Sequence, residues 1–231
     1  MADIAGIRKA IRALADPKRA TVLQGFFNTG PGEYGEGDKF IGLTVPQVRG
    51  LVRRFRPAGG VEISALLRSP IHEERLLALL LLVDRYERVY RDAAYRLYLR
   101  SFARINNWDL VDVSAPNIVG AHAVGRAQLL RWAGSSHLWT RRIAIVSTWA
   151  SIRERRYGDT LAVAARLLGD PHDLIHKAAG WMLREVGKRD VASLEGFLRR
   201  HHRRMPRTML RYAIERFPEP RRKAWLAGTA E

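Results

Sequence analysis

The sequence predicts an all-α protein of antiparallel helix pairs that stack into an α-solenoid. Apolar residues recur at spacings of three and four through almost all of its 231 residues, which is the period of an amphipathic helix. From Pro70 onward, a short polar turn followed by an alanine- or leucine-rich helix also recurs. These turns lie near Pro70, Asn107, His137, Pro171 and Pro206. Steps of 37, 30, 34 and 35 residues between them are typical of solenoids with two helices per repeat.

The N-terminal part is expected to form three helices and one long loop. The first helix runs roughly from Asp3 to Leu14, and Asp16-Pro17 opens a second helix that ends near Phe27. Residues 28–44 form a glycine-rich, irregular stretch. Thr44-Val45-Pro46 then caps a third helix, which reaches about Phe55.

The glycine-rich stretch contains Gly30-Pro-Gly-Glu-Tyr-Gly35, which formally matches the GxGxxG pattern of dinucleotide-binding loops. No strand is predicted before it, and a proline interrupts it. Glu33 and Glu36 would also repel a pyrophosphate. We therefore expect a loop that packs under the N-terminal helices.

Composition limits the class of protein. Residues 1–231 are long enough for a single well-buried domain without disulfides or metal, with repeats most evident from 70 to 227. The absence of cysteine excludes disulfides, thiol catalysis and cysteine-ligated metal sites. The longest apolar run, Leu76 to Val83, is too short to cross a bilayer, and no secretory signal is visible. We expect a cytoplasmic protein.

The charge balance points to a polyanionic partner. Lysine and arginine together number 40 against 23 acidic residues, which gives a net charge of +17. Nearly all of these cations are arginine, whose planar guanidinium suits phosphate. A genome that prefers arginine codons would explain the ratio of arginine to lysine, but it would not explain the net excess.

A carboxylate interrupts an apolar helical stripe near the middle of the chain. In the segment that begins Asn106-Asn107-Trp108-Asp109, helical spacing puts Trp108, Val111, Asp112, Ala115 and Val119 on one face. Burying an uncompensated carboxylate is costly, so Asp112 must be paired or lie on a working surface.

Two similar anomalies follow downstream. Arg142 interrupts the apolar stripe of a helix predicted over residues 138–149. In the helix predicted over 172–187, Trp181 lies away from the apolar stripe, on the same side as three cations. These are Lys177, Arg184 and Lys188.

The solenoid geometry relates these anomalies to one another. If each repeat helix is the second of its pair, all of them line the concave side of the superhelix. Trp108, Asp112, Arg142 and Trp181 then converge on one patch of a concave basic surface, which suits an extended polymer.

The same segments carry a family resemblance. FIGLTVPQVR from Phe40, NNWDLVDVSAP, LWTRRIAI and HKAAGWMLREVGK resemble the AlkD-type DNA alkylation repair proteins. These are HEAT-like-repeat glycosylases that remove cationic alkylated purines such as 3-methyladenine and 7-methylguanine. The resemblance implies active-site roles for Trp108 and Asp112, a phosphate contact for Arg142 and a second sugar-facing indole at Trp181. The interval between Asp112 and Arg142 is a few residues short of the family pattern.

The implied chemistry agrees with these residue types. An N3- or N7-alkylated purine is positively charged, so it leaves without a general acid, and the remaining barrier is oxocarbenium charge on the sugar. Asp112 would stabilise that charge, while the indoles of Trp108 and Trp181 face the sugar and the cationic base. The resemblance further implies that the base is not flipped, and no metal or organic cofactor is expected.

Further DNA contacts are expected at basic positions. These are Lys177, Arg184, Lys188, Arg203 and Arg207, the last two within the basic turn RRHHRRMPR. His172 and His176 have the spacing of a metal-binding pair, but no third ligand is in sight.

Each site residue also has a structural alternative. Trp108 could be a core residue, Asp112 a partner in a helix salt bridge, and Arg142 part of an inter-repeat pair.

The sequence thus predicts a monomeric DNA-alkylpurine glycosylase of base excision repair. It would act on alkylated duplex DNA in the cytoplasm, associated with the nucleoid through that DNA, without an obligate protein partner. The alternative is a non-catalytic HEAT-like scaffold that binds nucleic acid or protein.

Overall fold

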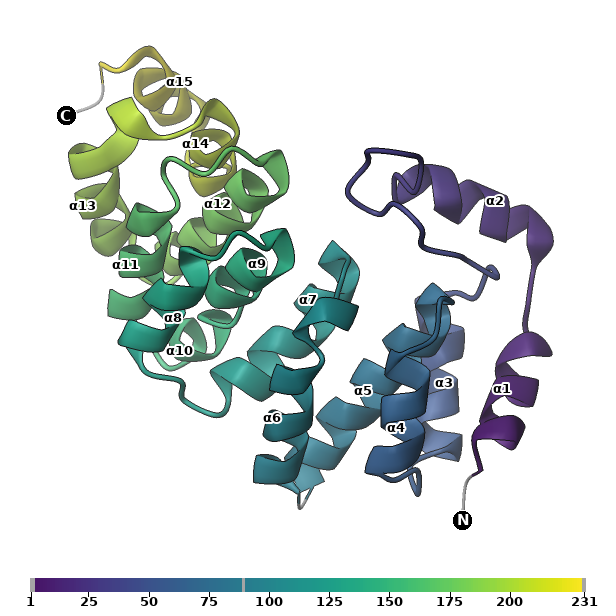
Figure 1. The fold of residues 1–231 in the computed structure, drawn as a ribbon. Coiled ribbons are helices and arrows are strands. Elements are labelled where there is room, and N and C mark those ends of the chain that lie inside the picture. The colour runs from purple at the N-terminus through teal and green to yellow at the C-terminus, as the bar shows by residue number, and fades with distance from the viewer. Residues whose placement is uncertain (1–2, 89, 230–231) are drawn as a thin grey trace. The chain divides into compact units, whose positions relative to one another are not determined.

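The computed structural model describes residues 3–88 and 90–229 (Figure 1). The regular structure of these residues is helical, together with an isolated β-bridge that pairs Lys39 with Ile71. Among the helices described, none combines the length and the apolar character that crossing a bilayer requires.

The chain divides into two compact units, Met1–Ile118 and Val119–Glu231. The first contains α1 (Ile4–Arg12), α2 (Pro17–Phe26), α3 (Val45–Arg54), α4 (Gly60–Leu67), α5 (His72–Arg88), α6 (Arg91–Arg100), η1 (Phe102–Arg104) and α7 (Trp108–Ala115). A π-turn, η2 (Pro116–Gly120), spans the boundary. The second contains α8 (Arg126–Ala133), α9 (Leu138–Val146), α10 (Trp149–Arg153), α11 (Gly158–Arg166), α12 (Asp173–Gly187), α13 (Val191–His201), η3 (His202–Arg204), α14 (Arg207–Ala213) and α15 (Glu219–Ala227).

The three N-terminal helices begin at the predicted caps. Asp3 accepts a hydrogen bond from the Gly6 amide, and Asp16 accepts one from the Arg19 amide at 3.0 Å. Thr44 forms a capping box with Gln47 at the start of α3. Each cap satisfies a backbone N–H that the first turn of a helix leaves without an intrahelical partner.

Helix α5 is the centre of the first unit. It packs against α1, α3, α4, α6 and α7. All of its leucines except Leu80, which is half-buried, are therefore buried, unlike those of a helix with one solvated face. Burial extends even to the four polar residues of its first turn, His72 to Arg75.

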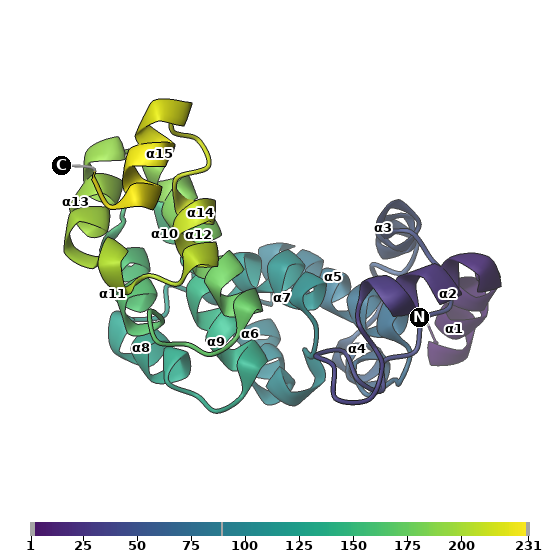
Figure 2. The same cartoon turned by 90° about the horizontal axis from the view of Figure 1, so that it is seen from above.

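Helix α12 has the corresponding position in the second unit, where it packs against α9, α11, α13 and α14. Figures 1 and 2 both show α14 lying beside α12. Gly180 permits this approach, because a Cβ there would lie 2.5 Å from both the Met209 carbonyl oxygen and the Tyr212 Cβ.

The predicted repeat helices are present and pack on one another within each unit. They begin at His72, Trp108, Leu138, Asp173 and Arg207. In the first unit α5 packs on α7, and in the second α9 packs on α12 and α12 on α14. Contact between equivalent helices of successive repeats is characteristic of an α-solenoid, so the predicted all-α architecture is confirmed.

Two predicted helices are shorter than expected. The helix over 138–149 breaks after Val146, because the hydroxyls of Ser147 and Thr148 donate to the carbonyls of Ala144 and Ile145. Trp149 then begins α10. The helix that carries Asp112 ends at Ala115 and continues as the π-turn, so the α-helix does not reach Val119 as the helical spacing predicted.

Candidate functional site

Helix α7 presents the predicted site residues of the first unit. Asn107 caps it by accepting a hydrogen bond from the Trp108 amide at 2.8 Å, and Asp109 places a negative charge in its first turn. Leu110 and Val111 are buried and fix the inner face of the helix. Trp108 and Asp112 lie one turn apart and are half-buried.

Trp108 and Asp112 line one cavity of about 390 Å³ within the first unit. The apolar wall is formed by residues that include Leu23, Phe26, Phe27, Phe40 and Val113. The carboxylate-bearing residues Glu73, Asp109 and Asp112 also border the cavity. The sequence-predicted pair therefore belongs to an aromatic chamber with acidic groups at its border.

The aromatic wall is a continuous stack. The rings of Trp108 and Phe27 are stacked with centroids 5.0 Å apart, and Phe27 stacks on Phe40 at 4.9 Å. Phe26 meets Trp108 edge-on at 6.0 Å while remaining 62% exposed. The indole Nε1 of Trp108 donates to the Tyr34 hydroxyl at 3.3 Å. These contacts hold the indole plane in a defined orientation.

Behind Asp112 lies a buried phenol. Tyr98 is fully buried, and its hydroxyl is hydrogen-bonded to Ser114 Oγ at 2.9 Å. Burial and the nearby negative charge of Asp112 outweigh this hydrogen bond and raise the pKa of Tyr98. The phenol therefore stays neutral at ordinary pH, and Asp112 is the acidic group that this part of α7 presents to the cavity.

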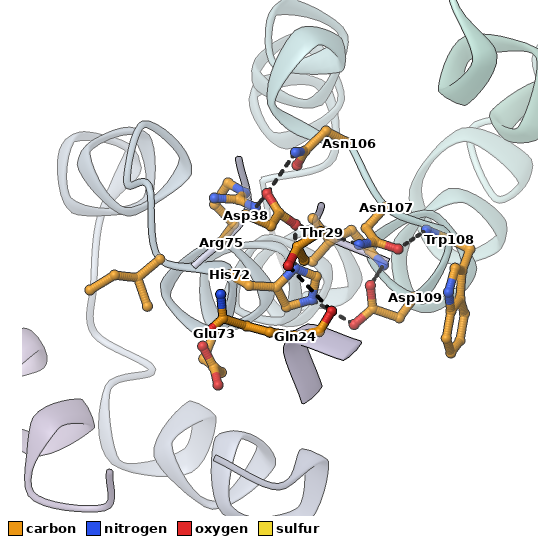
Figure 3. A network of polar contacts seen from close by, with 12 residues as sticks. Gln24, Thr29, Asp38, His72, Glu73, Arg75, Asn106, Asn107, Trp108 and Asp109 are labelled. Atoms are coloured by element: carbon orange, nitrogen blue, oxygen red, sulfur yellow. Dashed lines mark hydrogen bonds and ion pairs between the residues drawn. The ribbon is translucent and has the colours of Figure 1, made fainter. Parts of the chain in front are cut away.

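A polar network lies under the aromatic stack (Figure 3). His72, which is 1% exposed, bridges two carboxylates: Nδ1 lies 2.9 Å from Asp38 Oδ2, and Nε2 lies 2.8 Å from Asp109 Oδ2. Asp38 also accepts hydrogen bonds from Arg75 and, at 2.7 Å, from Asn106. The network joins the glycine-rich loop, the first turn of α5 and the first turn of α7.

The two carboxylates determine the charge of the histidine. Burial alone would lower the pKa of His72, but the charges and hydrogen bonds of Asp109 and Asp38 outweigh it and raise the pKa to about 9. For Asp38, burial acts in the opposite direction and would raise the pKa. His72, Arg75 and Asn106 together outweigh burial and hold the pKa of Asp38 below its usual value. At neutral pH His72 is an imidazolium between two carboxylates.

The neighbouring residues of α5 bind other elements. The Glu73 carboxylate accepts the amides of three consecutive residues, Ile41, Gly42 and Leu43, at 2.8 to 3.2 Å. Glu74 pairs with Arg8 of α1 at 3.1 Å. Phe40 and the residues after it are thereby held against α5. The Ile41 carbonyl also accepts the Asp16 amide at 2.8 Å and Phe40 stacks on Phe27, so the loop packs against the second N-terminal helix, as expected.

The loop does not offer its amides to an external phosphate. Glu33 accepts a hydrogen bond from the Gly30 amide at 2.8 Å, and Glu36 accepts one from the Gly32 amide at 3.0 Å. These are amides that a nucleotide-binding loop would direct at a pyrophosphate. The rejection of a dinucleotide site is supported by this geometry.

Arg142 and Trp181 lie in the second unit. Arg142 is 5% exposed, and its Nη1 donates to the Leu174 carbonyl at 2.8 Å, so the guanidinium is held between α9 and α12. The Trp181 ring is half-buried and lies 6.0 Å from that of Trp149. Arg189 covers Trp149, with its guanidinium carbon 5.2 Å from the ring centroid. Trp181 thus packs beside a second indole, that of Trp149, instead of standing alone on a solvated face.

The predicted basic face of α12 is neutralised in part by acidic partners. Lys177 pairs with Asp173 at 2.7 Å, and Lys188 pairs with Glu185 at 2.8 Å. Arg184 pairs with Glu215. The assignment of these cations to DNA remains a prediction, because an ion pair must exchange its acidic partner before it binds a phosphate.

The remaining predicted cations lie around the start of α14. Arg203 is exposed in η3, and Arg207 opens α14 and donates to the Leu226 carbonyl at 2.6 Å. The histidine pair has structural partners: His172 caps α12, and the His176 ring is hydrogen-bonded to the Asp170 carbonyl. Within residues 3–88 and 90–229, no group of three or more histidine or acidic side chains is arranged to hold a metal ion.

Several residues of the cavity escaped prediction. Phe26, Phe27 and His72 line the cavity, and Asp38 binds His72. All four are far from α7 in the sequence, and only the fold brings them near it. Two local signals were available. Adjacent phenylalanines lie at the end of α2, and four consecutive polar residues, His72 to Arg75, directly precede the apolar run from Leu76 to Val83.

Fold and cavity together define a helical-repeat protein with an aromatic site that carries a carboxylate. The sequence matches the family described as DNA alkylation repair enzyme over residues 7–217. The chain belongs to this family, which assigns it a role in DNA alkylation repair and DNA as its partner.

A solved structure supports the fold. A protein titled "Predicted DNA alkylation repair enzyme from Enterococcus faecalis" has a TM-score of 0.71 with this chain at 15% identity. The match covers 89% of this chain and 97% of that one. A comparison with curated proteins found no match.

Proposed function

We propose that this repair enzyme is a DNA glycosylase that releases positively charged N3- and N7-alkylated purines from duplex DNA. The observation that carries the proposal is the placement of Asp112 in the same aromatic cavity as Trp108. A carboxylate beside electron-rich rings stabilises a bound cation much more than a bound neutral ligand.

The reaction requires little acid catalysis. The glycosidic C1′–N9 bond breaks with its electron pair passing to the purine, whose positive charge is thereby neutralised. Positive charge develops on the deoxyribose, and an ionised carboxylate close to C1′ stabilises it. Water then adds to C1′ and loses its proton. Asp112 is the residue to which we assign this stabilisation and the orientation of the water.

Aromatic residues supply the second part of the site. Trp108 presents an indole face whose orientation is fixed by Phe27 and by the hydrogen bond to Tyr34. We assign to Trp108 and Trp181 contacts with the sugar and the cationic base. Phe26 extends the Trp108 surface toward solvent, because most of its side chain is exposed. An enzyme of this design needs no deep pocket for a flipped base.

Binding would rest on the net charge of +17, with the exposed Arg203 and Arg207 among the groups that contact phosphates. Arg142, which is 5% exposed, would have to leave the Leu174 carbonyl to make the phosphate contact that the resemblance implies. Such contacts fix the position of the duplex and do not read its sequence. Selectivity would then come from the charge of the lesion.

The test is release of 7-methylguanine from methylated duplex DNA by the wild type, by Asp112→Asn and by a control, Asp84→Asn. Asp84 is also an acidic residue of the first unit, but it pairs with Arg56 at 3.0 Å and does not line the cavity. We expect Asp112→Asn to lower the single-turnover rate by roughly 100-fold or more, because it removes a transition-state charge interaction.

The control is expected to retain the wild-type rate. Equal release by wild type and Asp112→Asn would eliminate the role assigned to Asp112. No release by the wild type would favour a non-catalytic DNA-binding scaffold. Excision of uracil, a neutral base, would contradict selectivity by charge.

A further inference from the structure

A charged histidine in α5 connects the glycine-rich loop to α7, the helix that carries Trp108 and Asp112. His72 opens α5 and contacts Asp38 in the glycine-rich loop and Asp109 in the first turn of α7 (Figure 3). Asp109 adjoins Trp108 and precedes Asp112 by three positions on one short helix. Helix α5 is the most buried element of its unit, so it is a rigid base for this contact.

We propose that His72, acting through Asp109, is a positioning residue that fixes the first turn of α7 and thereby the placement of Trp108 and Asp112. The inference rests on the proposed glycosylase function and deepens it. His72 borders the cavity but is only 1% exposed and is covered by the rings of Phe27 and Phe40, so we assign its effect to α7 and not to direct contact with the substrate.

The length of α7 makes an external anchor necessary. The helix has eight residues and is followed by a π-turn, and a helix this short is not stable by itself in water. Asn107 caps its first amide, but this contact is local and does not orient the helix relative to α5. The bond between His72 Nε2 and Asp109 Oδ2, at 2.8 Å, is a polar contact that joins α7 directly to α5. Since Asp112 lies about 4.5 Å further along the axis, a shift at Asp109 displaces it directly.

The charge of the histidine has a second consequence. Asp109 and Asp112 both border the cavity, so two negative charges lie near one another there. The imidazolium compensates the negative charge of Asp109 and so reduces the repulsion between Asp109 and Asp112.

Other charged groups around His72 have partners of their own. On α5, the Glu73 carboxylate is held by the amides of residues 41–43, and Arg75 by Asp38 and the Ser69 carbonyl. The rings of Phe27 and Phe40 cover the imidazole, with centroids 5.3 and 4.4 Å away. Asp38 and Asp109 are the two acids that face it.

The experiment compares His72→Gln with Glu74→Gln. Both replace a buried charged residue in the first turn of α5, but in the part of the chain that the structure describes the ion pair of Glu74 is with Arg8 of α1 and not with a residue of α7. We expect His72→Gln to lower the single-turnover rate of 7-methylguanine release by about 10- to 100-fold, since small displacements of a catalytic group cost this much. The dissociation constant for DNA should stay within about twofold of wild type, because no phosphate contact is removed.

A pH profile separates positioning from general support of the fold. In the wild type we expect the rate to fall as the pH rises through about 9, where His72 loses its proton. In His72→Gln this limb should be absent. Glu74→Gln should show the wild-type rate and profile even if its melting temperature is lower.

Hydrogen exchange tests positioning independently of activity. Amides of α7 should exchange at least 10-fold faster in His72→Gln than in Glu74→Gln, while those of α12 should be unchanged. If His72→Gln fails to fold, Asp109→Asn replaces it. This change keeps an acceptor for the histidine but removes the charge, so we expect the same effects in weaker form.

The inference is overturned if His72→Gln retains the wild-type rate and pH profile, or if the exchange of α7 matches that of the control. A wild type without glycosylase activity would instead refute the proposed function. In that case faster exchange of the α7 amides in His72→Gln would still show that His72 positions α7. Unchanged exchange would refute the positioning role together with the proposed function.

Discussion

At the scale of single residues, the first turn of α5 is the most unusual feature of the molecule. His72, Glu73, Glu74 and Arg75 are four consecutive charged or titratable residues, each almost completely buried. Burial of unpaired charge is strongly unfavourable, so each must find a partner. Each does so in another part of the first unit, and together they bind α1, α7 and the glycine-rich loop to α5.

The charge of His72 predicts how the stability of the protein depends on pH. Its pKa is raised from 6.5 to about 9 in the folded state, so folding favours the protonated form. The resulting stabilisation is complete below about pH 6.5 and is lost as the pH rises through about 9. Its size is on the order of 3 kcal/mol.

Urea denaturation at pH 6 and pH 9.5 measures this dependence. The free energy of unfolding of the wild type should fall between the two, and that of His72→Gln should fall by clearly less. Parallel losses in both proteins would show that another group is responsible.

At the scale of elements, the glycine-rich loop is a structural part of the cavity wall. Glu73 holds it through three backbone amides, and Gly42 adopts a φ of +90°. A Cβ at Gly42 would lie 2.1 Å from the Asp16 carbonyl oxygen. The loop can therefore follow this path beside the start of α2 only because this residue is glycine.

Gly42→Ala is expected to destabilise the protein by about 2–4 kcal/mol, because backbone strain adds to a clash with backbone atoms. The matched control is Gly50→Ala in α3, where a Cβ would meet nothing within 4 Å. There we expect a gain of about 0.5–1 kcal/mol from helix propensity. Denaturant unfolding of both variants checks the prediction, which fails if Gly42→Ala is as stable as the wild type.

At the scale of the whole molecule, the net charge is +17, and the cations that contribute to it differ in whether they form an ion pair with an acidic residue. Lys177, Arg184 and Lys188 have acidic partners on the second unit. Arg203 is exposed, and no ion pair involves it in the part of the chain that the structure describes. An unpaired cation releases a counterion from DNA without first giving up an acidic partner.

We therefore expect Arg203→Ala to weaken binding to duplex DNA and to reduce the slope of log affinity against log salt by about 1. Lys177→Ala also removes one positive charge, but Lys177 is already paired with Asp173. We therefore expect it to reduce the slope by less than Arg203→Ala does. Titrations between 50 and 200 mM salt, a range over which phosphate contacts change affinity strongly, measure both slopes. Equal slopes for wild type and Arg203→Ala would exclude a phosphate contact at this residue.

The sequence determined the elements that depend on neighbours along the chain. Helical period, repeat spacing and the caps at Asp3, Asp16 and Thr44 are local features, and the structure reproduces them. The same holds for Trp108 and Asp112, whose spacing places them on one side of α7. Where hydroxyls compete with the helix, as at Ser147 and Thr148, the pattern of apolar residues was misleading.

The surroundings of those residues depend on contacts between segments that are far apart in the sequence. His72 meets Asp38 and Asp109 across 34 and 37 positions of sequence, and Phe27 reaches Trp108 across 81. The spacing of apolar residues predicts which face of a helix is buried, but it does not predict which distant side chain lies against that face. The charge of the imidazole and the orientation of the indole depend on those distant partners, so they became visible only in the folded chain.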